Sequence, residues 1–262
     1  MAYLKNSSPF LYDTVTNGIV GVRSDVGNHY FQTGIYEPAS FKQAPGLSIA
    51  AAAATFTGLT YNDDGGNVRL VSAGVHGIAA GSVGHSVYVT WAGGTGVNGF
   101  YPIVTRSVTT SLTIALPYVL GLGTPTVSLV NSDITLATQT IPAGTINPGM
   151  VLELDMLFSC TGSSNNKTFK ANLGSAAWYS QTVAASIQSL CVEKKACVLS
   201  ATDIISNALA APGHGTATGA NVTMTPSGGV GAEQNLTIVG SLANAGEFLR
   251  LEAWGLKING YW

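Results

Sequence analysis

The sequence predicts an all-β protein: an N-terminal extended arm, a small antiparallel β-sandwich or barrel, and a C-terminal jelly-roll-like β-sandwich. Three observations support this fold class. Short runs of β-branched and aromatic residues recur along the chain, and clusters of glycine, asparagine and serine separate them. Several of these runs alternate between apolar and polar residues, as half-buried strands do. Helical periodicity is not sustained, and the only helical candidates are short pieces near Ala50 and at Thr202–Leu209.

The composition is poor in charge and rich in glycine. Of 262 residues, 9% are charged and 32 are glycine, and the formal net charge is −2. An ordinary globular domain carries roughly 25% charged residues. The hydrophobic content of 46% excludes a disordered chain, and the lack of a basic field argues against nucleic-acid binding. A surface with so few ions must be wetted by neutral polar side chains or covered by partners.

Residues 1–55 form an irregular segment, predicted to be an N-terminal docking arm and connector. Aromatic residues are scattered in it among glycine, asparagine and serine, with no periodicity that would support a core. A second interpretation stays open, in which this segment is an edge of the following domain. The alanine-rich end of the segment is either a short helical turn or a closely packed connector. The aromatic candidates for docking contacts are Tyr3, Phe10, Tyr12, Tyr30 and Phe31.

Residues 56–131 are predicted to form the small β-module. Turns rich in glycine and asparagine at 62–67 and 93–99 separate its strands. No charged residue occurs between Arg106 and Asp133, so we expect a tightly packed, uncharged unit. The strand candidates are 68–71, 86–91, 99–104 and 111–116.

Residues 132–262 are predicted to form the jelly-roll-like domain, because about eight antiparallel strands fit two packed sheets. The clearest alternation runs from Val151 to Phe158, with Leu152, Leu154, Met156 and Phe158 on one face and Glu153 and Asp155 on the other. The strand candidates are 134–141, 150–160, 167–173, 178–183, 189–200, 221–225, 235–241 and 247–259.

The last strand candidate repeats the alternation. A strict period of two places Trp254 on the same face as Phe248, Arg250 and Glu252, and Leu249 and Leu251 on the opposite face with Ala253 and Gly255.

Cysteine usage and the apolar runs indicate the compartment. Three cysteines, Cys160, Cys191 and Cys197, cannot all pair within one chain, so we expect reduced, buried thiols made in a cytoplasm. A Cys191–Cys197 bridge across a hairpin is the alternative. The first residues lack the pattern of a signal peptide, and the apolar run 47–56 is far below the roughly 20 residues of a membrane span.

Metal and phosphate chemistry finds little support in the sequence. The glycine-rich stretch 93–96 lacks the lysine of a phosphate-binding loop, so a hairpin loop is the interpretation. The four histidines, His29, His76, His85 and His214, have no second ligand at metal spacing. His76 and His85 could meet across a hairpin, but no cysteine accompanies them. We therefore expect no metal and no cofactor.

Catalytic patterns are equally weak. Glu153, Asp155 and Glu252 could share one sheet face, and a glycosidase needs two such carboxylates in a cleft. Exposed positions on an outer sheet face are the favoured interpretation. Asp63 and Asp64 do not match a calcium loop, so they are assigned to a turn. We expect no catalytic residues, and hence no enzyme.

Assembly is the function that the composition favours. Like charges of identical copies meet at a symmetry axis, so a subunit interface is built more easily from neutral polar, alanine and aromatic residues. Burying such residues removes no ion from water. We therefore expect a homo-oligomer.

About half of the chain, from Tyr61 to Gly174 together with the closing strand, resembles the appendage proteins of tailed bacteriophages. One set of segments resembles the C-terminal β-domain of these proteins, and another resembles the small β-module often placed ahead of it. The first set is Thr140–Thr145, Val151–Leu154, Leu157–Ser159, Asn165–Thr168 and Leu173–Gly174. The second set is Gly66–Leu70, Gly74–Gly77, Ser86–Val89 and Gly99–Tyr101.

This resemblance implies a structural protein on the exterior of a phage particle, made in the host cytoplasm and trimeric, with a dimer and a pentamer as open alternatives. Tail fibre or tail-tip attachment to a host surface glycan or protein is the first hypothesis. Capsid decoration, as a cement or head-fibre protein, is the second. The third is a glycan-cleaving enzyme, which lacks support because the long parallel β-helix of polysaccharide-cleaving tail spikes has no counterpart here.

The expected partners follow from these hypotheses. They are further copies of the chain, other virion proteins contacted through the arm, and a host glycan or protein, without nucleic acid or membrane insertion. Four aromatic residues are candidates for stacking on a glycan or for contacts at an interface. Core or trimer-axis packing is the alternative for each. The candidates are Trp178, Tyr179, Trp254 and Trp262.

Overall fold

The structure is a computed structural model that describes the chain in several stretches. Regular structure in these stretches consists of β-strands and one short 3-10 helix, η2 (Ala80–Ser82). The all-β fold class is thereby confirmed. Within the described stretches, no helix is long and apolar enough to cross a membrane. The described residues are 10–13, 18–22, 47–53, 56, 58–107, 109–211 and 219–260.

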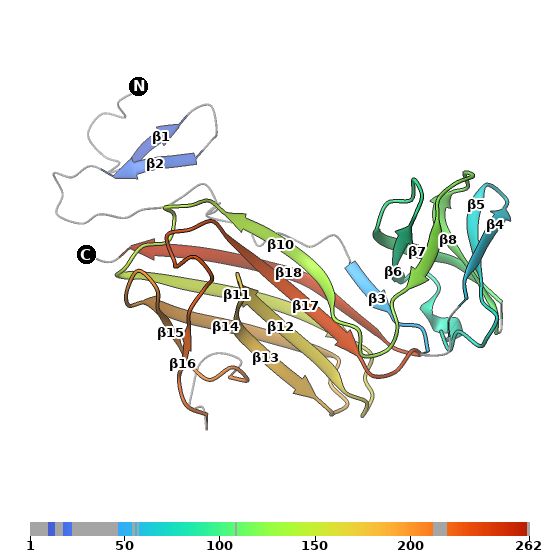
Figure 1. Ribbon diagram of the computed structural model, residues 1–262. Helices are drawn as coiled ribbons and strands as arrows, with labels where there is room; N and C mark the ends of the chain where they lie inside the picture. Colours follow the sequence, from blue (N-terminus) through green and yellow to red (C-terminus); the bar gives the residue numbers. More distant parts are fainter. Residues whose placement is uncertain are drawn as a thin grey trace.

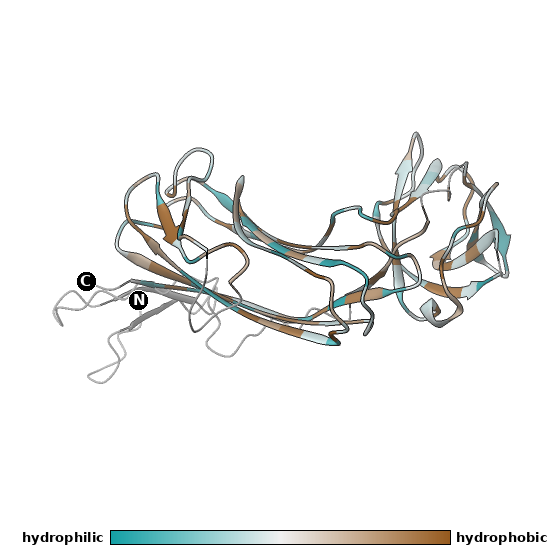
Figure 2. Cartoon of the chain, turned by 90° about the horizontal axis from the view of Figure 1, so that it is seen from below, coloured by the Kyte–Doolittle hydropathy of each residue, from teal (hydrophilic) through white to brown (hydrophobic). Residues whose placement is uncertain are grey.

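A two-layered β-sandwich forms the larger part of the molecule, and a smaller β-module lies at one end of it (Figure 1). Viewed from below, the two layers extend alongside each other (Figure 2). One layer is the four-stranded sheet β10-β17-β12-β13, and the other is the β16-β15-β14-β11-β18 part of a 12-stranded sheet. The bounds are β10 (Ile134–Ile141), β11 (Met150–Cys160), β12 (Lys167–Leu173), β13 (Ala176–Val183), β14 (Ser189–Val198), β15 (Ile204–Ser206), β16 (Val222–Met224), β17 (Gln234–Leu242) and β18 (Phe248–Gly260).

Strands from the start and the end of the sandwich pair with each other. The antiparallel pairs β10–β17 and β11–β18 join segments about ninety or more residues apart, and β17 lies between β10 and β12. Long-range pairing of this kind, in place of a succession of hairpins, is characteristic of jelly-roll-like sandwiches.

The helical candidate at Thr202–Leu209 is wrong. Its centre forms β15, which pairs with β14 through Ala196 and Ser206. Ile204 and Ser206 are buried, whereas Ile205 between them is partly exposed. This period of two matches a strand, and pairing with a neighbouring strand overrides the weak local helical preference.

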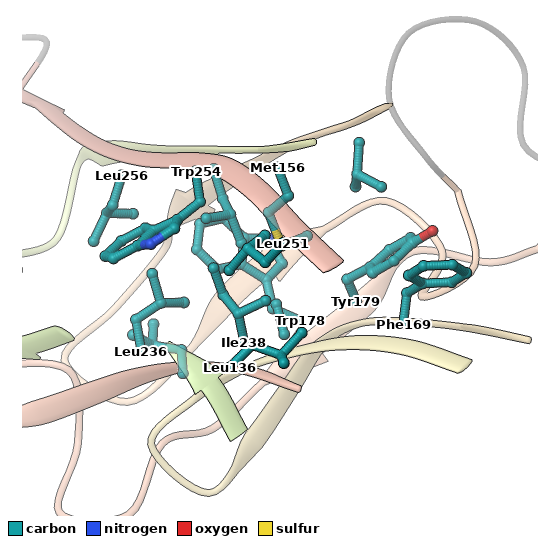
Figure 3. Close-up of a cluster of buried hydrophobic side chains, with 14 of the residues drawn as sticks. Leu136, Met156, Phe169, Trp178, Tyr179, Leu236, Ile238, Leu251, Trp254 and Leu256 are labelled. Atoms are coloured by element: carbon teal, nitrogen blue, oxygen red, sulfur yellow. The ribbon is translucent and has the colours of Figure 1, made fainter. Parts of the chain in front are cut away.

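The sandwich core lies between the two sheets and confirms the alternation predicted for β11. The exposed fraction is at most 1% for each of the four residues Leu152, Leu154, Met156 and Phe158. Phe158 packs edge-on against Phe169 from the opposite sheet, with ring centroids 4.9 Å apart. Figure 3 shows side chains from both sheets converging on one apolar layer.

A β-bulge in β18 explains why one sequence prediction is wrong. Leu157 pairs with Ala253, but the next residue, Phe158, pairs with Leu251, so one extra residue of β18 lies between them. Beyond the extra residue, the side chains that point into the core are those at even positions instead of odd ones. Trp254 therefore points into the core, on the same side as Leu249 and Leu251, instead of the opposite side.

The smaller module is a curled antiparallel sheet with strand order β9-β6-β7-β8-β5-β4. Its curvature brings β4 close to β9. Near this point, the backbone N–H of Leu122 donates a hydrogen bond to the Tyr61 hydroxyl, at 2.9 Å. The bounds are β4 (Thr60–Asp64), β5 (Asn67–Val71), β6 (Ser86–Ala92), β7 (Gly99–Arg106), β8 (Ser111–Pro117) and β9 (Thr124–Val127).

Strand β3 (Leu47–Ala50) joins the two units into one continuous sheet. It pairs antiparallel with β18 of the sandwich and parallel with β6 of the module. The residues around Ala50 therefore form a strand and closely packed connector, and the helical alternative is wrong. The His85 ring stacks on Phe248 across this junction, with centroids 4.4 Å apart. In the arm, β1 (Phe10–Asp13) and β2 (Gly18–Val22) pair antiparallel.

A buried ion pair fixes the loop between β11 and β12. Lys167 and Glu247 are 0% and 5% exposed, and their charged atoms lie 3.6 Å apart. The Lys167 ammonium donates hydrogen bonds to the carbonyls of Ser163 and Asn165 at 3.0 and 3.1 Å. The Ser163 hydroxyl and the Asn165 amide donate to one Glu247 oxygen, each at 2.5 Å. Each charge thus has several partners that replace its hydration.

A second buried lysine, Lys194, donates hydrogen bonds to carbonyl oxygens of Asn207 and Ala208. Its ammonium donates to the carbonyl of Ala208 at 2.8 Å and to the backbone and side-chain oxygens of Asn207. The side chain is 1% exposed and lies over the Tyr179 ring. Burial lowers the pKa of Lys194 to about 8. This lysine holds the turn after β15 against the sandwich.

We expect the stabilising contribution of Lys194 to increase between about pH 8 and pH 10. The folded protein releases this proton near pH 8, whereas an unfolded chain retains it to about pH 10.4, so the unfolded state binds more protons in this window. The gain over the full window is on the order of 3 kcal/mol. Urea unfolding of wild type and Lys194→Met at several pH values measures it. A difference between the two proteins that stays constant from pH 8 to pH 10 would contradict the prediction.

Candidate functional site

The aromatic residues predicted to contact a glycan or an interface lie in the core. Trp178 and Tyr179 are 0% exposed and Trp254 is 6% exposed. Figure 3 shows all three among the apolar side chains between the sheets. The Trp178 indole donates to the Ser206 hydroxyl at 3.2 Å, and the Tyr179 hydroxyl donates to Gln181 at 2.5 Å. Their assignment to a glycan-binding rim is therefore wrong, because no ring face is accessible to a ligand.

The other aromatic candidates belong to the N-terminal arm and to the last position of the chain. Trp262, Tyr3, Tyr30 and Phe31 lie outside the described residues. Phe10 and Tyr12 belong to β1, but their side chains are not among those described.

The histidines that the structure describes have structural partners. His76 is buried; its Nδ1 accepts the backbone N–H of Ile78 at 3.0 Å, and its Nε2 lies 3.2 Å from the carbonyl of Ser107. Burial lowers the pKa of His76 and of His85. Within the described part of the chain, no three histidine, cysteine or acidic residues gather as metal ligands. His29 and His214 lie outside that part.

The three carboxylates singled out in the sequence lie on one sheet face, and neighbouring side chains bind two of them, Glu153 and Glu252. Glu153 accepts salt bridges from Lys195 at 3.1 Å and Lys257 at 3.2 Å. Although burial opposes the effect, hydrogen bonds from these lysines lower the pKa of Glu153. Glu252 accepts a hydrogen bond from Ser159 and a salt bridge from Arg250. The favoured interpretation as an outer sheet face matches this arrangement.

This surface, which we call the outer face, consists of the side chains of β14, β11 and β18 that point away from the core. The pairing register arranges them in five rows across the strands. Four of the rows are Cys197–Val151–Asn259, Lys195–Glu153–Lys257, Glu193–Asp155–Gly255 and Cys191–Leu157–Ala253, and the fifth, at the end of β11, is Ser189–Ser159–Arg250.

The charges on the outer face form stripes. The row of Lys195, Glu153 and Lys257 carries a net charge of +1, because one carboxylate lies between two ammonium groups. The next row carries two carboxylates, since Asp155 pairs directly with Glu193 across the strands. Burial, Glu193 and Glu153 raise the pKa of Asp155, in that order of importance. Like charges directly opposite each other disfavour the pairing of two strands.

The cysteines correct another expectation. Cys160 is buried, as predicted, but Cys191 and Cys197 are exposed, and all three are free thiols. Cys191 and Cys197 lie on the same strand, β14, instead of facing each other across a hairpin. Because they are six residues apart, they project from the same side of the sheet and cannot bridge each other.

The smaller module presents a second candidate surface at two interlocked loops. The backbone N–H groups of Thr95 and Gly96 donate to the carbonyls of Gly121 and Leu122, each at 2.9 Å. Each loop exposes a large apolar side chain to solvent: Val97 is 72% exposed and Leu120 is 83% exposed. Exposed apolar groups held on a hydrogen-bonded framework are suited to binding another protein or a ligand.

Replacing Gly94 by alanine is expected to separate these loops. A Cβ atom at Gly94 would collide with backbone atoms of Leu122 and Gly123, which cannot rotate away. We expect a loss of about 2 kcal/mol in the free energy of unfolding, typical of overpacking. Gly81→Ala is the matched control, since its Cβ would meet no atom within 4 Å. Urea unfolding of both variants tests this; equal stabilities would contradict the interlocked geometry.

Comparison with known proteins adds no assignment. No family model matches this chain, and no curated protein matches it.

Proposed function

We propose that this chain is a structural protein of a tailed-phage particle, displayed on the exterior as a homo-oligomer that contacts the host surface. The resemblance of its turn and strand segments to phage appendage proteins is one support. The proposal assigns no reaction to the chain. The proposal requires that copies of the chain bind one another and that the oligomer is present on the surface of the particle.

The observation that carries the proposal is the continuous sheet that runs from the sandwich into the smaller module. Strand β3 pairs with both units, so the module is a fixed extension of the sandwich. The hydrogen-bonded loops with Val97 and Leu120 belong to this extension. Such an arrangement suits a protein that holds a contact surface at a set place, as tail fibres and tail tips do. An enzyme would instead require converging polar groups in a pocket.

Electron microscopy of particles labelled with antibodies against this chain tests the proposal. Label on the tail supports an attachment protein, whereas label on the head supports the capsid-decoration alternative. Native mass measurement of the purified protein is expected to give a multiple of 26.9 kDa, and three copies would match the trimer that the resemblance implies. Absence of the chain from purified particles would contradict a structural role of either kind. Release of sugar from host polysaccharide by the purified protein would support the enzyme hypothesis instead.

Host attachment has its own test at the loops of the smaller module. Leu120→Asp places a charge on an exposed side chain without disturbing a buried one, so the fold is expected to persist. Particles that carry this variant are expected to adsorb to host cells about tenfold or more slowly. Leu199→Asp, at another exposed leucine on the sandwich, is the control that should adsorb normally.

A further inference from the structure

We propose that the outer face of the sandwich is a two-fold contact between two copies of this chain, in which the β14 strands lie antiparallel over each other. The inference rests on the proposed function in one respect: both require contacts between copies. It adds the surface, the symmetry and the residues that meet.

The first observation is the order of exposed residues along β14. After Ser189 at the start of the strand, the side chains on the outer face are Cys191, Glu193, Lys195 and Cys197, with buried residues between these four. This order is self-complementary when read in opposite directions. A two-fold axis in the plane of the contact, crossing the strands between Glu193 and Lys195, places Glu193 of each copy over Lys195 of the other.

The same axis aligns the neighbouring strands. Each strand of one copy lies over the same strand of the second copy, with the order of the rows reversed. The lysine row with net charge +1 then faces the row of Asp155 and Glu193, which carries two carboxylates. Glu153 meets Asp155 in this arrangement, but Lys195 and Lys257 already neutralise Glu153 within its own sheet. The contact thus places the row with net positive charge against the row with two carboxylates, which favours association.

Apolar residues complete the contact. The Cys191–Leu157–Ala253 row of one copy faces the Cys197–Val151–Asn259 row of the other, so Leu157 packs against the second copy's Val151. Leu157 is 41% exposed in a single copy, although it lies in the middle of an 11-residue strand. Sheets that pack face to face in this way lie about 10 Å apart.

The positions of the two exposed thiols provide a direct test. In the two-fold contact, Cys191 of one copy faces Cys197 of the other. Within one copy these thiols are separated by six strand residues, roughly 20 Å, which is beyond the reach of a short bismaleimide cross-linker. We expect cross-linking of a mixture of ¹⁵N-labelled and unlabelled protein to give Cys191–Cys197 links between copies. Trypsin separates the two thiols by cleaving at Lys194 and Lys195, so mass spectrometry identifies each link.

Charge reversal supplies an independent test by analytical ultracentrifugation of the full chain. Glu193→Lys places lysine over lysine, and Lys195→Glu places glutamate over glutamate, so each is expected to weaken self-association about tenfold or more. The double variant Glu193→Lys/Lys195→Glu restores opposite charges and is expected to recover association. Glu233→Lys, an exposed position before β17, is the control that leaves association unchanged. Circular dichroism verifies that each variant is folded.

The outcomes separate the two proposals. A wild-type chain that remains monomeric at all concentrations overturns this inference and the homo-oligomer of the proposed function together. A wild-type oligomer with an odd number of copies, such as a trimer, overturns this inference alone, because a two-fold contact joins copies in pairs. The same holds for an oligomer whose cross-links join only like cysteines, or whose stability is unchanged by the single reversals. Association lost in the single variants and regained in the double variant supports it.

Discussion

Glu247→Ala is expected to reduce the free energy of unfolding by about 3–5 kcal/mol, a large part of the stability of an ordinary domain. The substitution leaves the Lys167 ammonium, which is 0% exposed, without its counter-ion. It also removes the acceptor of the Ser163 hydroxyl and the Asn165 amide. Thermal and urea unfolding measure the loss, and the loop between β11 and β12 should lose hydrogen-exchange protection first.

An exposed ion pair in the same sandwich provides the matched control. Lys170 and Asp133 lie 2.6 Å apart, but their side chains are 31% and 52% exposed, so solvent screens the attraction. Asp133→Ala is therefore expected to cost less than about 1 kcal/mol. The double variant Lys167→Met/Glu247→Leu, which replaces both charges by apolar groups, should recover part of the loss. Equal costs for Glu247→Ala and Asp133→Ala would show that burial does not govern the first pair.

Trp178→Ala is expected to destabilise the sandwich by about 3–5 kcal/mol, as truncation of a fully buried aromatic residue does. Trp178 packs between the two sheets and its indole donates to Ser206, which ties β13 to β15. The variant leaves a cavity, and the Ser206 hydroxyl loses the indole donor while it keeps its own hydrogen bond to the carbonyl of Lys195. Chemical unfolding measures the effect, together with binding of a dye that reports exposed apolar surface.

Trp178→Phe separates packing from hydrogen bonding. Phenylalanine retains most of the buried ring but cannot donate to Ser206, so we expect a loss of about 1–2 kcal/mol. Particle adsorption by a folded Trp178→Phe variant should equal that of wild type, because residue 178 has no exposed surface. Selective loss of glycan binding in this variant would restore Trp178 as a binding residue.

The sequence predicted the general fold because strand patterns are local. The alternation from Leu152 to Phe158 identifies one buried face without knowledge of any neighbour, and the structure confirms it. Trp254 shows where local reasoning ends. The bulge at Glu252, between Leu251 and Ala253, is defined only by pairing with β11, and it reverses the face of every later residue in the strand.

The surfaces proposed as functional could not be predicted from the amino-acid sequence alone. Opposition of Glu193 to Asp155 depends on the register between β11 and β14, which no local pattern specifies. The exposure of Cys191 and Cys197 depends on which side of that sheet faces the core. One signal was present in the sequence: the alternate residues of 191–197 have a palindromic order of polarity, which is meaningful only once they share a face.

The junction at β3 has a mechanical consequence. The chain crosses between sandwich and module twice, and the two crossings are tied together, since Ala52 exchanges backbone hydrogen bonds of 2.8 Å with Ser128 and Val130. Domains joined by a flexible linker swivel under load. Here a pull on the loops at Leu120 reaches the sandwich as tension along paired strands. The module is therefore expected to move with the sandwich as one stiff body when a force acts on its loops.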